Sequence, residues 1–200
     1  MPKNLTAYVA ELIGTFGLSL VVILSLLGKF PIPVPVAAAL TLGLFVYSVG
    51  GFSGTHINPA VTIGLLSIKK ISWEDAFGYL IAQFAGAALA MLIGKSMGIQ
   101  NLDLPGSSAI IAIAEAIGMF FFSFGIASVV YEKVSKEVSG LVVGGSLLLG
   151  IIISSSIGSA GILNPAVELA IGMFTPMYIF GAILGSIMGF NLYALLKKSE

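Results

Sequence analysis

Six long apolar stretches, separated by charges, prolines and glycine-rich turns, run through the sequence. They cover residues 5–27, 34–52, 74–97, 107–131, 139–157 and 175–196. Each is close to the roughly 20 apolar residues with which an α-helix crosses the hydrocarbon core of a bilayer. Only 9% of the residues are charged, whereas a soluble domain carries about 25%. We therefore predict an all-α membrane protein with six transmembrane helices.

The composition also excludes several kinds of site. The nine basic residues are all lysine and the formal net charge is zero, so a basic surface for nucleic acid is not expected. The absence of cysteine and the presence of a single histidine argue against disulfides and against the usual metal sites. We expect no cofactor, no metal and no nucleic-acid partner.

The lysines predict how the chain is oriented. With six crossings both termini lie on one side, and with a cytoplasmic N-terminus seven lysines are inside and two are outside. Those inside are Lys3, Lys69, Lys70, Lys133, Lys136, Lys197 and Lys198, and those outside are Lys29 and Lys95. Cytoplasmic loops carry an excess of positive residues. We therefore predict a multi-pass plasma-membrane protein with both termini in the cytoplasm.

Two shorter apolar segments, at 58–68 and 164–173, each open with the tripeptide Asn-Pro-Ala. The two tripeptides are Asn58, Pro59, Ala60 and Asn164, Pro165, Ala166. The segments are too short to cross a bilayer and follow glycine- and serine-rich turns, which favours re-entrant half-helices enclosed by protein. Asparagine is a good helix N-cap, and proline is well suited to the first helical position.

The two halves of the chain repeat. Residues 10–14 reappear as 114–118, and 58–61 reappear as 164–167; the third match pairs Tyr79, Ala82, Gly86 and Ala90 with Tyr178, Gly181, Gly185 and Gly189. We predict a single transmembrane domain over 1–200, with a first repeat at 1–104 and a second at 105–200. Three spans per half invert the second repeat, which places the working site near the membrane midplane between the halves.

Two inverted half-helices that meet at their N-terminal ends predict a particular chemistry at that point. Each end carries the equivalent of roughly half a positive charge, and each asparagine offers an amide donor. The junction therefore favours a neutral molecule that accepts hydrogen bonds, and disfavours a cation.

Four segments together resemble the aquaporin and glycerol-facilitator family. They are AELIGTF at 10–16, SGTHINPAV at 53–61, YLIAQFAGA at 79–87 and NPAV at 164–167. The resemblance covers nearly the whole chain. It implies a homotetramer with one pore per subunit, which passes water or small neutral solutes without a cofactor or covalent chemistry, and so implies that the protein is not an enzyme.

The sequence departs from the family pattern at the outer constriction. Typical members resemble one another in having arginine after the second Asn-Pro-Ala, where this chain has Val167. Counting from the two motifs places Ala38 where water channels have phenylalanine, and Ile152 where they have histidine and glycerol channels have glycine; Gly161 completes the set. We predict an apolar constriction that is wider than a strict water filter and admits glycerol, urea or ammonia.

Five further polar residues are candidates for a role in the site, and four of them have competing interpretations. Carboxylates within membrane helices suggest function, so Glu11 and Glu115 could relay protons, but we favour hydrogen bonds to the re-entrant loops. For His56 a structural hydrogen bond is favoured over pH gating, and Gln83 is expected to tether a loop. Glu168 lies in the first turn of the second half-helix, where it either meets the helix dipole or faces the outer mouth.

Three classes of function remain to be compared. A passive channel explains the doubled Asn-Pro-Ala motif and the inverted repeat. A proton-coupled secondary transporter also fits an inverted repeat and would use the membrane glutamates. A non-conducting structural membrane protein would favour long outer loops, and the loop near 96–106 is short. We favour the channel.

Overall fold

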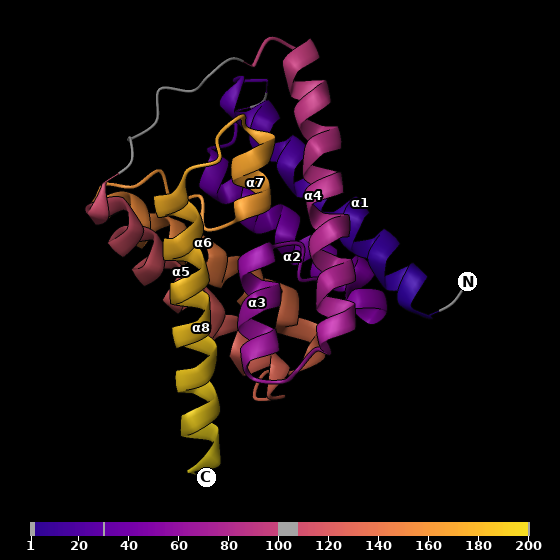
Figure 1. Ribbon diagram of the computed structural model, residues 1–200, viewed down its shortest axis with the longest axis vertical. Helices are drawn as coiled ribbons and strands as arrows, with labels where there is room; N and C mark the ends of the chain where they lie inside the picture. Colours follow the sequence, from indigo (N-terminus) through magenta and orange to yellow (C-terminus); the bar gives the residue numbers. More distant parts are fainter. Residues whose placement is uncertain (1–2, 30, 100–107, 200) are drawn as a thin grey trace.

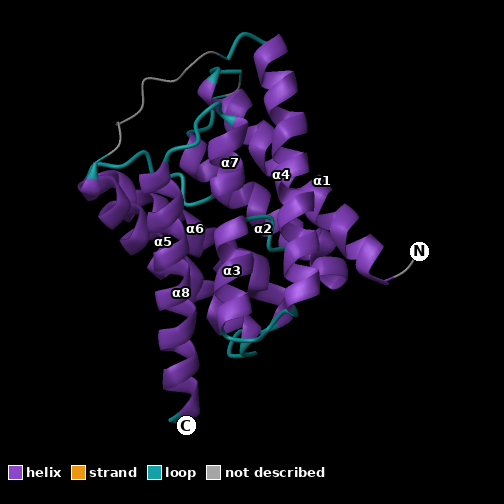
Figure 2. Cartoon of the chain, viewed as in Figure 1, coloured by secondary structure: helices purple, strands orange, loops and turns teal. Residues whose placement is uncertain are grey.

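The computed structural model describes residues 3–29, 31–99 and 108–199, and these fold into a bundle of helices joined by short loops (Figures 1 and 2). In chain order the elements are α1 (Lys3–Leu26), α2 (Val34–Ser53), α3 (Pro59–Ser67), α4 (Trp73–Ser96), α5 (Ala109–Val130), the 3-10 turn η1 (Lys136–Val138), α6 (Ser139–Ile157), α7 (Pro165–Ala170) and α8 (Pro176–Lys198).

Six of these helices are long and apolar enough to cross a membrane, namely α1, α2, α4, α5, α6 and α8. The predicted all-α fold with six spans is therefore confirmed, with helix ends shifted by a few residues. The predicted start of the fourth span, at 107, lies outside the described residues. The second short helix is shorter than the predicted 164–173: it ends at Ala170, and Gly172 two residues later adopts a φ of +82°, a conformation that ends helices.

Local sequence explains where several helices begin. Ser72 caps α4, with its Oγ accepting a hydrogen bond from the Asp75 N–H at 3.1 Å, and Glu74 and Asp75 stand in the first turn, where they meet the positive end of the helix. Proline occupies the first turn of α2, α3, α7 and α8, where its missing N–H costs no helical hydrogen bond.

The helices pack in the same pattern in each half of the chain. Helix α1 packs against α4, and α5 packs against α8 in the same way; α3 then lies on α8 and α7 on α4, so each short helix contacts the opposite half. Figure 1 shows α7 and α3 in line, one above the other, near the centre of the bundle. The expected boundary between repeats, at 104/105, lies outside the described residues.

Glycines allow the paired long helices to approach closely. A Cβ placed on Gly181 of α8 would lie 2.5 Å from the Ala112 carbonyl oxygen of α5, and one on Gly86 of α4 would lie 2.9 Å from the Phe16 backbone nitrogen of α1. Both distances are too short for a real side chain. Small residues at these crossings let membrane helices gain van der Waals contact along their backbones, which fixes the frame that holds the two short helices.

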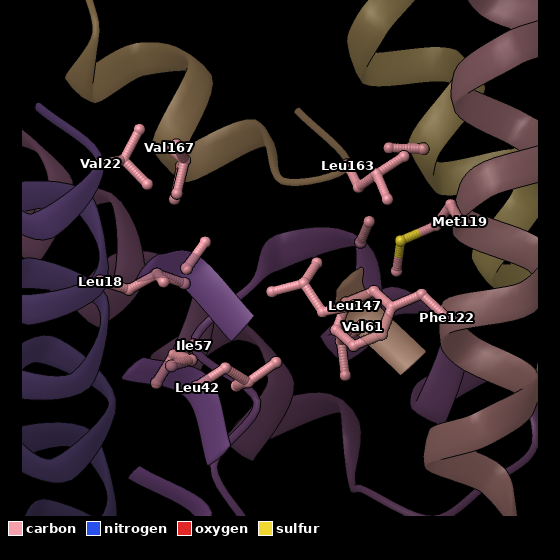
Figure 3. Close-up of a cluster of buried hydrophobic side chains, with 14 of the residues drawn as sticks. Leu18, Val22, Leu42, Ile57, Val61, Met119, Phe122, Leu147, Leu163 and Val167 are labelled. Atoms are coloured by element: carbon pink, nitrogen blue, oxygen red, sulfur yellow. The ribbon is translucent and has the colours of Figure 1, made fainter. Parts of the chain in front are cut away.

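The buried apolar core surrounds the meeting point of the two halves. Figure 3 shows Val22 of α1 and Val167 of α7 pointing toward one another, while Leu163 lies near Met119 of α5. Ile57, which immediately precedes the first Asn-Pro-Ala, is fully buried in the same cluster. The core thus encloses both re-entrant loops, and these loops hold the candidate site.

Candidate functional site

Each short helix begins with an asparagine N-cap. The Asn58 side-chain oxygen accepts a hydrogen bond from the Ala60 N–H at 2.9 Å, and the Asn164 oxygen accepts one from the Ala166 N–H at 3.0 Å. Pro59 and Pro165 occupy the first helical position of α3 and α7. Both tripeptides are buried, so the caps satisfy backbone N–H groups that water cannot reach.

The two asparagines also bind across the junction. The Asn58 amide nitrogen donates to the Leu163 carbonyl oxygen at 2.9 Å, and the Asn164 amide nitrogen donates to the Ile57 carbonyl oxygen at 3.0 Å. A primary amide carries two hydrogens. Each asparagine therefore uses one hydrogen to fasten the two loops together and keeps one for the space between them.

Glu11 of α1 holds the first re-entrant loop. Its carboxylate, fully buried, accepts four hydrogen bonds. They come from Ser53 Oγ at 2.6 Å, the His56 N–H at 2.9 Å, the Ile57 N–H at 2.6 Å and Gln83 Nε2 at 2.7 Å. Hydrogen bonds to a charged acceptor are about twice as strong as neutral ones, so this carboxylate fixes the backbone that leads into α3.

Glu115 of α5 holds the second loop in the same way. It is also fully buried, and it accepts hydrogen bonds from Ser154 Oγ at 3.2 Å, Ser159 Oγ, the Ile162 N–H at 3.1 Å and the Leu163 N–H at 2.7 Å. The two glutamates thus stand at equivalent positions and each binds two consecutive backbone N–H groups ahead of an Asn-Pro-Ala. Each carboxylate therefore accepts four hydrogen bonds from its own half of the chain.

Both loops adopt left-handed backbone conformations at matched positions. Thr55 and Ile57 have φ values of 55° and 37° in the first loop, and Gly161 and Leu163 have values of 66° and 54° in the second. Such a conformation costs a residue with a Cβ about 1–2 kcal/mol. The hydrogen bonds to the two glutamates offset this cost and hold the loops in a shape that the local sequence does not favour.

A cavity of about 250 Å³ lies at the junction and extends along α1, α2 and α6. Its polar lining residues are His56, Asn58 and Asn164. The remaining wall is apolar and includes Leu18, Val22, Ala38, Leu42, Phe122, Leu147, Ile151, Val167 and Ile171. The polar lining residues therefore all come from the two re-entrant loops, whereas the long helices contribute apolar residues.

Three of the four predicted constriction residues line this cavity, and one does not. Ala38, Gly161 and Val167 are in the wall. Ile152 is 52% exposed on the outside of α6, whereas its neighbour Ile151 is 7% exposed and lines the cavity. The prediction for Ile152 is therefore wrong by one position. Consecutive helical residues point about 100° apart, so a one-residue error in the count exchanges the cavity side for the lipid side.

Glu168 lies within the protein. It is 1% exposed and is not part of the cavity wall, so the alternative that placed it at the outer mouth is wrong. Its Oε1 accepts a hydrogen bond from the backbone N–H of Thr175, the N-cap residue of α8, which ties α7 to the next helix. Within the described part of the chain, no group of three or more His, Asp or Glu side chains could hold a metal ion.

His56 and Gln83 belong to a network that also contains residues the sequence did not single out. His56 Nδ1 lies 3.1 Å from Thr62 Oγ1, and the edge of the Tyr79 ring packs against the imidazole with centroids 4.9 Å apart. Gln83 Nε2 donates to both Glu11 and Thr62. The internal repeat of the sequence points to two further residues that bind the buried glutamates.

These two residues are serines at equivalent positions in the two halves of the repeat. Ser53 and Ser159 each stand five residues before an Asn-Pro-Ala asparagine, and each donates to the buried glutamate of its own half. Thr62 has no such counterpart, because the second half has Glu168 at the matching position.

Several known proteins have similar sequences, and one solved structure has a similar fold. The chain is 30% identical to aquaporin NIP1-3 of Oryza sativa over 213 residues, covering 96% of this chain and 74% of that protein, and 30% identical to aquaporin AqpM of Methanothermobacter marburgensis over 190 residues, covering 84% and 77%. The aquaglyceroporin of Plasmodium falciparum has a similar fold, with a TM-score of 0.74, 20% identity, and coverage of 96% of this chain and 95% of that one. The sequence model of the major intrinsic proteins matches residues 2–193, and the chain therefore belongs to the major intrinsic protein family, the family of the aquaporins.

Proposed function

We propose that the protein is a passive channel that conducts water and small uncharged solutes, such as glycerol, urea or ammonia, through the cavity where α3 and α7 meet. The family supports a membrane channel for water or small solutes. The observation that carries the proposal is the junction itself: Asn58 and Asn164 both line the cavity, and each keeps one amide hydrogen after the crosswise bonds. Two donors beside two positive helix ends bind a neutral acceptor and oppose a cation.

The outer part of the proposed pore has no ionisable side chain. Ala38, Ile151, Gly161 and Val167 contribute its wall, and arginine is absent from the chain, since all nine basic residues are lysine. A fixed charge in a low-dielectric channel attracts polar solutes and repels cations strongly. Without one, the constriction selects by size and apolarity, which favours solutes larger or less polar than water.

The hydrogen bonding of the two membrane glutamates favours a channel over a proton-coupled transporter. Glu11 and Glu115 are each occupied by four donors and neither lines the cavity. A relay carboxylate needs access to the transported proton, which this enclosure prevents. The open cavity likewise argues against a purely structural membrane protein.

We place the protein in the plasma membrane as a homotetramer with both termini in the cytoplasm. The orientation rests on the seven lysines that then lie inside, against two outside. The tetramer rests on family resemblance.

Proteoliposomes test the proposed function directly. Vesicles with the purified protein should shrink faster than empty vesicles when water leaves, and should re-swell faster in glycerol or urea. Val167→Arg should lower glycerol and urea flux by at least about tenfold, which is about 1.4 kcal/mol in the barrier, because it adds bulk and charge to the wall. Val167→Met adds bulk alone and should lower it less. Rapid water flux with no glycerol or urea flux in the unaltered protein refutes the wide-pore proposal.

A further inference from the structure

The buried carboxyl group of Glu168 has far fewer partners than the other two buried carboxyl groups. Glu11 and Glu115 each accept four hydrogen bonds, which occupy both oxygens of each group. Glu168 is 1% exposed, and its hydrogen-bond partner is Thr175, through the backbone N–H and the side chain. Oε2 of Glu168 is enclosed and has no partner among the described residues. Glu168 therefore lacks the set of donors that stabilises a buried negative charge.

No positive charge makes up for the missing donors within the part of the chain that the structure describes. Helices α1, α3, α4 and α8 pack against α7, and the titratable groups that interact with Glu168 are Glu115 of α5 and Tyr178 of α8. Glu115 is held as a carboxylate by its four donors, so it repels a second negative charge. A buried charge without partners is much more costly than an unpaired neutral group. The burial and the neighbours of Glu168 both favour its protonated form.

Glu168 also holds α7 in place from the side opposite the cavity. Val167 and Ile171 line the cavity, and Glu168 does not. Its carboxyl group instead meets the N–H of Thr175, the N-cap residue of α8. Helix α7 has only six residues, and the turn that follows it is exposed at Gly172. The contact between Glu168 and Thr175 therefore closes the segment that carries this part of the cavity wall.

We propose that Glu168 is an uncharged carboxylic acid at neutral pH and that in this form it positions α7 in the cavity wall. Loss of its proton would leave an enclosed charge with one partner residue, and the segment from Glu168 to Thr175 would move toward water at the exposed turn. Val167 and Asn164 on the same short helix would move with it, so conductance falls as the pH rises. The matching position on α3 holds Thr62, which shows that a neutral polar side chain serves there.

The same burial determines how stability depends on pH. In the unfolded chain the carboxyl group of Glu168 is in water and ionises readily, whereas the folded protein keeps its proton. The folded state therefore binds more protons than the unfolded state, and stability falls as the pH rises through the titration of this group. A carboxylate that is fully hydrogen-bonded in the folded protein gives the opposite dependence. The effect on stability is independent of conduction, while the effect on flux rests on the proposed channel function.

Infrared spectroscopy of the protein in bilayers tests the protonation directly. A neutral carboxylic acid has a carbonyl stretching band that a carboxylate lacks. We expect this band in the unaltered protein at neutral pH and its loss in Glu168→Gln. Glu74→Gln is the control and should retain the band, because Glu74 is exposed in the first turn of α4. A spectrum without the band in the unaltered protein, or a band that survives in Glu168→Gln, overturns the inference.

Unfolding and water flux test the positioning role. Glutamine keeps the oxygen that accepts from Thr175 and cannot ionise. From neutral to alkaline pH, the unfolding midpoint of the unaltered protein in detergent should fall by at least about 3 °C more than that of Glu168→Gln. Water flux in proteoliposomes should fall over the same range in the unaltered protein and in Glu74→Gln, but not in Glu168→Gln.

Two outcomes separate this inference from the proposed function. Identical pH profiles of midpoint and flux for the unaltered protein and Glu168→Gln overturn the positioning role and leave the channel in place. An unaltered protein that conducts neither water nor solute at any pH refutes the proposed function, and the infrared band and the unfolding midpoints then still decide the protonation of Glu168.

Discussion

Replacing Glu11 with glutamine should unfasten the first re-entrant loop. Glutamine keeps one side-chain oxygen and replaces the other with an amide donor. If the amide takes the place of Oε2, it faces the Ile57 N–H and Gln83 Nε2. If it takes the place of Oε1, it faces Ser53 Oγ and the His56 N–H. In either orientation a buried backbone N–H loses its acceptor. A buried donor without a partner costs about 1–3 kcal/mol, so two opposed donors cost about 2–6 kcal/mol.

That cost is a large part of the roughly 5–15 kcal/mol by which proteins are stable. We therefore expect Glu11→Gln to lower the thermal unfolding midpoint in detergent and to reduce water flux in proteoliposomes. Glu74→Gln is the matched control, because Glu74 is exposed in the first turn of α4, and a surface change of this kind usually stays within 0.5 kcal/mol. Equal midpoints and equal water flux for the two variants would show that the carboxylate does not hold the loop.

Two further predictions concern packing and the cavity wall. Gly43→Ala should destabilise the crossing of α2 and α6 by about 1–3 kcal/mol, because the added Cβ would lie 2.8 Å from the Gly140 carbonyl oxygen. Gly145→Ala on α6 is the control, since a Cβ at that position has no neighbouring atom within 4 Å. This variant should unfold no earlier than the unaltered protein in the same detergent assay. Ile151→Ala should raise glycerol flux because it widens the cavity, whereas Ile152→Ala should not, because Ile152 is 52% exposed on the outside of α6. Vesicle re-swelling in glycerol measures both variants. The opposite result would support Ile152 as the constriction residue.

The sequence predicted the helices well because hydrophobic length is a local property. Six apolar stretches became six long helices, and the two Asn-Pro-Ala segments became α3 and α7. The second of these is shorter than predicted, since the turn at Gly172 depends on its φ of +82°. Helix ends of this kind are set by backbone conformation, which an apolar pattern does not encode.

The cavity wall was harder to predict because it depends on rotation about a helix axis. Ala38 and Val167 follow directly from the two motifs, but the contribution of α6 had to be counted through a loop, and an error of one residue replaced Ile151 with Ile152. Thr62 was missed for another reason. Its importance comes from two residues, His56 and Gln83, that reach it from a loop and from another helix, and no local pattern reports such a meeting.

The two halves share the features that build the site and differ in the features that could select a solute. Glu11 and Glu115 occupy equivalent positions and perform the same task, as do the two asparagines. His56 breaks this symmetry, because its counterpart is Ile162. In the proposed channel, we expect discrimination among neutral solutes to come from the size and apolarity of the cavity wall, to which Ala38, Ile151, Gly161 and Val167 contribute.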